Sequence, residues 1–83
     1  MMDTAQVLNL ICERLRDVAA AKGANIEING DTRILGGPLP VDSLDLAGIV
    51  VELEGITGHD PFRDGFVNFH TVGELARLYS GAA

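Results

Sequence analysis

The sequence contains no tryptophan, one tyrosine and three phenylalanines in 83 residues, so its core has to be mostly aliphatic. No apolar run in it approaches the roughly 20 residues that span a membrane. The N-terminus also lacks the basic, apolar and small-residue order of a signal peptide. The single cysteine, Cys12, has no partner for an internal disulfide, which favours a reducing compartment. We therefore expect a cytoplasmic protein in which Cys12 is an inert, packed thiol.

Positive charge is also scarce. The chain has 6 Lys and Arg against 12 Asp and Glu, a formal net charge of −6 and a pI near 4.5. Such a protein repels nucleic-acid backbones and anionic membranes and attracts basic surfaces of other proteins. Between residues 34 and 62 there is no Lys or Arg, and the carboxylates there are Asp42, Asp45, Glu52, Glu54 and Asp60. They fit either a solvated acidic face or a surface for a basic partner.

The length sets the domain organisation. An 83-residue chain has room for one hydrophobic core, and 47% hydrophobic residues are enough to form it. We expect a single domain over residues 1–83, and a monomer.

Apolar residues recur at helical spacing in three stretches. The first helix is predicted from about Thr4 to Ala21, with Asp3 or Thr4 as its cap and Gly23 just beyond its end. The second is predicted from about Ser43 to Glu54. The third opens at Thr71, which has the spacing of a capping box with the glutamate three residues later.

Residues 60–64 carry the signals of one further helical turn. Asp60 suits an N-cap, Pro61 the first helical position and Gly65 the residue past the end. The predicted fold is therefore all-α, a four-helix bundle with three longer helices and one short helix.

The loops are expected to pack against these helices. Residues 24–41 are predicted to be an extended loop whose isoleucines rest on the helices, rather than a strand, because no second strand is available to pair with it. The phenylalanines of the later loop are expected to cover the end of the core; they are Phe62, Phe66 and Phe69.

The second helix has two apolar sides when its residues are placed at roughly 100° intervals. The core face comprises Leu46, Ile49, Val50 and Leu53. The other side comprises Leu44, Ala47 and Val51, next to a strip of Asp45, Gly48 and Glu52. Such a helix is either sandwiched between neighbours or meets a partner. The acids favour the partner, because a buried face would not tolerate them unpaired.

Ser43 stands between two aspartates at the start of this helix, and several roles compete for it. It fits a plain helix cap, but Asp42 can cap the helix itself and leave the Ser43 hydroxyl free. A hydrolytic nucleophile is disfavoured, because the flanking residues lack the glycines of a nucleophile elbow and the neighbouring carboxylates oppose an oxyanion. His59 and His70 have no recognisable catalytic setting and no metal-ligand spacing, so no metal site is expected.

A third role for Ser43 is covalent attachment of a phosphate-linked group. A helix N-terminus offers backbone N–H groups and positive dipole character to a phosphodiester. An exposed serine there can carry a long arm without disturbing the core.

Three motifs in this order resemble the acyl carrier protein family. They are Asp42-Ser43-Leu44 followed by Asp45, the helix ending Val51-Glu52-Leu53-Glu54, and the later Thr71-Val72-Gly73-Glu74-Leu75. The resemblance covers nearly the whole chain. The tripeptide alone is a weak signal, and its combination with length, acidity and spacing makes it specific.

The resemblance implies a function. Ser43, within the motif of Asp42 and Leu44, would receive 4′-phosphopantetheine from coenzyme A through a phosphopantetheinyl transferase. The arm would hold an acyl or aminoacyl group as a thioester, and the protein would itself catalyse nothing. Loading enzymes and downstream biosynthetic enzymes with basic docking surfaces would bind the second helix, at Leu44, Asp45, Ala47, Gly48, Val51 and Glu52.

Departures from the family pattern point away from fatty-acid synthesis. Gly48 and Gly55 stand where such members commonly carry acids, and Pro40 replaces a usual glycine. They favour a stand-alone carrier in a specialised pathway: polyketide, nonribosomal peptide, or modified sugar or lipid assembly. The identity of the carried group stays open. The alternative is an acidic helical interaction module without a prosthetic group.

Overall fold

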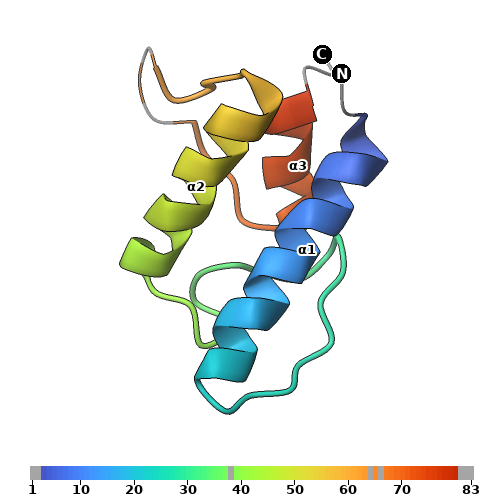
Figure 1. Ribbon diagram of the computed structural model, residues 1–83, viewed down its shortest axis with the longest axis vertical. Coiled ribbons are helices and arrows are strands. Elements are labelled where there is room, and N and C mark those ends of the chain that lie inside the picture. The colour runs from blue at the N-terminus through green and yellow to red at the C-terminus, as the bar shows by residue number, and fades with distance from the viewer. Residues whose placement is uncertain (1–2, 38, 64, 66, 81–83) are drawn as a thin grey trace.

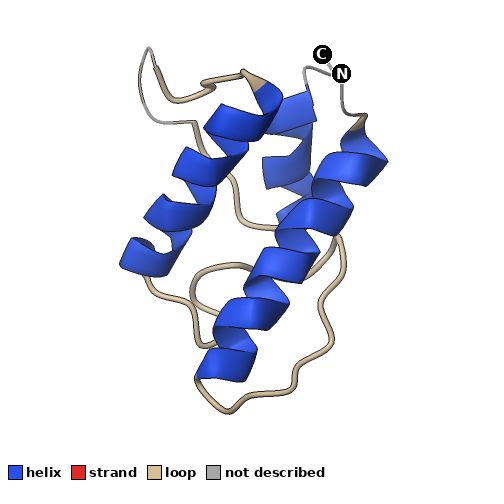
Figure 2. Cartoon of the chain, viewed as in Figure 1, coloured by secondary structure: helices blue, strands red, loops and turns tan. Residues whose placement is uncertain are grey.

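The chain folds into a small set of helices joined by long loops (Figure 1). The computed structural model describes residues 3–37, 39–63, 65 and 67–80. Its helices are α1 (Thr4–Ala21), α2 (Ser43–Thr57) and α3 (Val72–Ser80). The described part of the chain contains no strand (Figure 2). The all-helical class is therefore confirmed.

The short fourth helix predicted at residues 60–64 is not formed by the residues that are described there. Residues 61–63 are turns, in which Arg63 N donates to Asp60 O at 3.2 Å and Gly65 N donates to Phe62 O at 3.2 Å. Gly65 then takes a positive φ of 138°, which a continuing right-handed helix cannot use. One turn is also too short to offset the cost of helix nucleation. Residue 64 lies outside the described residues.

The start of α1 follows its sequence signals. Asp3 caps the helix, because its Oδ1 accepts from Gln6 N at 2.8 Å while Gln6 Oε1 accepts from Asp3 N at 2.9 Å. After Ala21 the chain turns at Gly23, whose φ of +78° is left-handed. Both predicted ends of this helix are confirmed.

The end of α2 lies three residues beyond the predicted Glu54, at Thr57. Gly55 does not stop the helix, because an interior glycine costs only about 1 kcal/mol relative to alanine. The helix ends instead at Gly58, which has a φ of +75° and whose N–H donates to Glu54 O at 2.9 Å. The residue that stops α2 is thus the glycine that takes the left-handed conformation.

The described residues of the loop 24–41 lie along the helices without forming a strand, as predicted. Ile28 is 4% exposed and belongs to the core, while Ile26 packs partly buried against it. The same loop is tied to the start of α3. Val72 N donates to Thr32 O at 3.0 Å, and Gly73 N donates to Gly30 O at 2.8 Å.

The core is mostly aliphatic and lies between the three helices. α1 packs mainly against α3, and α2 leans on this pair (Figure 1). The largest side chains that are almost fully buried are Val7, Ile11, Leu15, Ile34, Leu53, Val72, Leu75 and Tyr79. Of the predicted face of α2, Leu46, Ile49 and Leu53 are buried and Val50 is partly buried. Within the described residues, each helix is too short or too polar to cross a membrane.

Candidate functional site

Ser43 is the first residue of α2 and is exposed. The cap is Asp42, whose Oδ1 accepts from Asp45 N at 2.9 Å, while Asp45 Oδ2 accepts from Asp42 N at 3.2 Å. This reciprocal box leaves Ser43 without a capping role. Its Oγ makes no hydrogen bond to any described residue. The prediction that Asp42 caps the helix and frees the serine hydroxyl is confirmed.

Lys22, the residue that caps the C-terminus of α1, braces the segment that carries Ser43. Lys22 Nζ donates to Asp45 Oδ2 at 2.5 Å and to Pro40 O at 2.7 Å. The hydrogen bond from Lys22, and then that from the backbone of Asp42, lowers the pKa of Asp45. The carboxylate is therefore ionised at neutral pH, and its charge near the helix tip is offset by the lysine.

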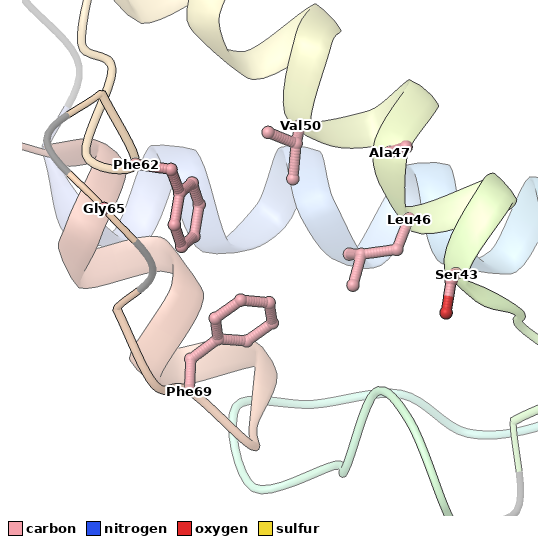
Figure 3. Close-up of a pocket in the computed structure, with 7 residues that line it drawn as sticks. All are labelled: Ser43, Leu46, Ala47, Val50, Phe62, Gly65 and Phe69. Carbon is pink, nitrogen blue, oxygen red and sulfur yellow. The ribbon is translucent and has the colours of Figure 1, made fainter.

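An open groove of about 460 Å³ begins at Ser43 and runs between α2 and the loop before α3 (Figure 3). In Figure 3, Leu46 points into the space between α2 and the rings of Phe62 and Phe69. The groove is lined by Ser43, Leu46, Ala47, Val50, Phe62, Gly65 and Phe69. The wall is apolar apart from the serine hydroxyl, so the groove suits an apolar chain that starts at Ser43.

The aromatic wall of the groove rests on the core. The rings of Phe62 and Phe69 lie 5.8 Å apart, centroid to centroid, at an interplanar angle of 56°. Phe62 also packs on Tyr79, with centroids 6.3 Å apart. Burial, followed by the charges of Asp60 and Glu54, raises the pKa of Tyr79 to about 12, so this phenol stays neutral. The prediction that phenylalanines cover the end of the core holds for the two described; Phe66 lies outside the described residues.

The outer side of α2 is apolar and uncovered by the rest of the described chain. Leu44 is 81% exposed and Val51 is 67% exposed, and Ala47 and Gly48 between them are exposed as well. Large apolar side chains at such exposure are what a partner-binding face presents. The two apolar sides predicted for the helix therefore exist, with one buried and one open.

The acids beside this face are paired with cations, although residues 34–62 contain no Lys or Arg. Asp45 pairs with Lys22, and Glu52 accepts from Arg14 Nε at 2.9 Å through Oε1 and 2.7 Å through Oε2. Arg14 lies in α1, and Lys22 is the residue that caps its C-terminus. Charges that are segregated along the chain are thus brought together by the fold, and no local pattern in residues 34–62 could have shown it.

The remaining reactive side chains that the structure describes do not form a second site. Cys12 is 5% exposed, and burial raises the pKa of its thiol, so it is an inert core residue as expected. Among the described residues, no three His, Cys, Asp or Glu side chains come together as a metal site would require.

Sequence comparison alone identifies no relative, since no family model matches the chain and no curated protein matches it. Among solved structures, the chain is similar to the solution structure of MacpD, an acyl carrier protein from Pseudomonas fluorescens involved in mupirocin biosynthesis. The identity is 32% and the TM-score 0.74, over 96% of this chain and 73% of MacpD. That likeness extends over nearly the whole chain. The chain therefore belongs to the acyl carrier protein family and is a carrier protein, not an enzyme.

Proposed function

We propose that this acyl carrier protein bears 4′-phosphopantetheine on Ser43 and presents an acyl or aminoacyl group, held as a thioester, to the enzymes of a specialised biosynthetic pathway. The observation that supports the attachment site is the exposed, unbonded Ser43 hydroxyl at the N-terminus of α2. The specialised pathway is supported by the role of MacpD in mupirocin biosynthesis. It is also supported by Gly48 and Gly55, which stand where acids are usual in carriers for fatty-acid synthesis.

The residues around Ser43 fit a phosphodiester-linked arm. The Asp42–Asp45 box fixes the helix start, so the Ser43 Oγ stays outside the hydrogen-bonded turn and is accessible to a transferase. The helix N-terminus stabilises the negative charge of the phosphodiester. The prosthetic group supplies a thiol on a long arm. Leu46, Val50 and the two phenylalanines offer that arm or its cargo an apolar resting surface.

The transfer of the group needs an acceptor hydroxyl from this chain and everything else from partners. The Ser43 Oγ forms a bond to the phosphorus next to the pantetheine of coenzyme A, and the bond from that phosphorus to the adenosine phosphate breaks. The nucleotide leaves, and the serine proton goes to the transferase or solvent. The Ser43 Oγ is hydrogen-bonded to no base among the described residues, and the neighbouring carboxylates of Asp42 and Asp45 are engaged in the capping box, which fits an acceptor activated by a separate enzyme.

Partner enzymes with basic docking surfaces are proposed to bind the outer side of α2, at Leu44, Asp45, Ala47, Gly48, Val51 and Glu52. Gly48 supports this surface independently, because a Cβ built on it meets no atom within 4 Å. The fold therefore does not require glycine there, although alanine would favour the helix by about 1 kcal/mol. Close approach of a partner to the helix backbone gives the glycine a role.

The single domain, the monomeric state and the cytoplasmic location stay predictions.

Intact-protein mass spectrometry tests the proposal. Purified protein is incubated with a broad-specificity phosphopantetheinyl transferase, coenzyme A and Mg²⁺. We expect the mass of one phosphopantetheine to be added to the wild type and nothing to be added to Ser43→Ala. Ser80→Ala changes the only other serine, which is 7% exposed, and should be modified like the wild type.

Two results would contradict the proposal. If several transferases leave the wild type unmodified, the alternative of an acidic interaction module without a prosthetic group becomes the better reading. If Ser43→Ala still gains the group, the attachment site is misassigned.

A further inference from the structure

The two carboxylates of the proposed docking surface are already bound by cations of the same chain. Arg14 donates to both oxygens of Glu52, and Lys22 donates to Asp45. α1 and its C-cap residue therefore supply to α2 the kind of contact that a basic partner would make. No such cation lies on α2 itself.

The Arg14–Glu52 pair is held on the α1 side as well. Arg14 Nη1 lies 3.6 Å from Glu13 Oε1 and 3.9 Å from Asp17 Oδ2. The hydrogen bond to Glu52, and then the charge of Glu52, raises the pKa of Arg14, so the guanidinium is charged at every working pH. Its side chain is 33% exposed and that of Glu52 is 39% exposed. The pair is thus formed at the surface, where a partner can compete for it.

We propose that Arg14 and Lys22 act as built-in competitors that weaken the docking of basic partner surfaces at Glu52 and Asp45, so that the apolar residues Leu44, Ala47 and Val51 dominate recognition. The inference rests on the proposed function, because it concerns partners of the carrier. The partner is a protein with a basic docking surface, which the net charge of −6 attracts over distance. On contact, its cations meet carboxylates whose charge is already offset. Exchanging one ion pair for another brings little net affinity.

If Arg14 competes with the partner for Glu52, its removal should have the opposite effect on docking to the removal of a residue that contacts the partner. Removing Arg14 should strengthen docking, because it frees Glu52 for the partner. Lys22 is a poorer probe, because its second bond, to Pro40 O, also braces the segment before Ser43. Arg16 is the matched control for Arg14. It lies on the same helix, is exposed and carries the same charge, but forms no ion pair with a described residue.

The experiment measures kcat/KM of a phosphopantetheinyl transferase that has a basic docking surface, at low and at high salt. Arg14→Ala should raise kcat/KM by about two- to fivefold over Arg16→Ala at low salt, the range of exposed ion-pair energies. The two variants lose the same net charge, so long-range attraction cancels between them. The difference should shrink at high salt.

A double-mutant cycle with Glu52→Gln identifies the competing pair. Glu52→Gln should lower kcat/KM by a larger factor in the Arg14→Ala background, where Glu52 is free for the partner, than in the wild type, where Arg14 holds it. In the Arg14→Ala background it should cancel the gain. The proposal is overturned if Arg14→Ala and Arg16→Ala behave alike, or if Glu52→Gln lowers kcat/KM equally in both backgrounds. Circular dichroism of each variant confirms that it is folded. If the wild type gains no phosphopantetheine at all, the proposed function fails, which is a different result.

Discussion

α3 and α2 use their residues in opposite ways. α3 has 9 residues and buries five of them: Val72, Leu75, Ala76, Tyr79 and Ser80. α2 has 15 residues and buries only Leu46, Ile49 and Leu53, while it leaves Leu44 and Val51 largely in solvent. The shorter helix is thus a packing element. The longer helix presents a surface to solvent. Its sequence contains residues that lower stability and that the fold does not require.

The same substitution in the two helices should separate these roles most strongly. Leu75→Ala removes a side chain that is fully buried, and should lower the free energy of unfolding by about 2–5 kcal/mol. Leu44→Ala removes one that is 81% exposed, and should change it by less than about 0.5 kcal/mol. Urea denaturation followed by circular dichroism measures both.

For Leu44→Ala and Leu75→Ala, the effects on the kcat/KM of the transferase should fall in the reverse order to the effects on stability. In the transferase assay, Leu44→Ala should lower kcat/KM although the protein remains as stable as the wild type, because Leu44 is proposed to contact partners. A large loss of stability in Leu44→Ala would mean that the outer side of α2 is packed in solution, and the contrast between the helices would disappear.

The glycines sharpen the comparison with a smaller effect. A Cβ at Gly48 of α2 meets nothing within 4 Å, so Gly48→Ala should raise the free energy of unfolding by about 0.5–1 kcal/mol. A Cβ at Gly73 of α3 would lie 3.0 Å from Gly30 O, which is held in place by a 2.8 Å hydrogen bond from Gly73 N. Gly73→Ala should therefore destabilise the protein, because this carbonyl has to move.

Thermal and urea unfolding of the two alanine variants give the sign of each change. If α2 presents a surface to partners, Gly48→Ala should also slow modification by the transferase while it stabilises the fold. If Gly48→Ala is destabilising, the glycine has a structural role that the free space around it does not reveal.

These contrasts also explain what could be predicted from sequence. The helix starts followed local signals, because Asp3, Asp42 and Thr71 each cap through residues three positions away. The two sides of α2 followed from its periodicity. In the same way, the free hydroxyl of Ser43 followed from having a second capping residue next to it.

The features that could not be predicted from sequence are of two kinds. Some depend on contacts between residues far apart in the sequence, and others on which of two similar glycines takes the left-handed conformation. Gly55 and Gly58 look alike in the sequence, but only Gly58 takes the left-handed conformation that ends α2. The turn after Asp60 had helical signals without the length to sustain a helix. The ion pairs of Asp45 and Glu52 join residues 23 and 38 positions apart, so they depend on how α1 and α2 pack. The groove wall at Phe62 and Phe69 depends on the same packing.

The smallest expected effect concerns acid stability, and it tests whether the α1–α2 pairing exists in solution. Lys22 lowers the pKa of Asp45 below its ordinary 3.8 in the folded protein. A depressed carboxyl pKa contributes stability that is present above the unfolded-state value and is lost as pH falls through the folded-state value. The free energy of unfolding should therefore decline below about pH 4. That of the Lys22→Ala variant should decline less steeply than that of Arg16→Ala, which removes the same charge but no pair.

The bond from Lys22 to Pro40 O does not titrate in this range, so its loss shifts the whole curve without changing the slope. Glu74 in the capping box of α3, whose pKa is lowered chiefly by the hydrogen bond from Thr71 N, should titrate equally in both variants. Urea midpoints from about pH 5 to pH 3 at low salt measure the difference. Parallel curves for the two variants would mean that Lys22 and Asp45 do not pair in solution, and that Asp45 is open to partners after all.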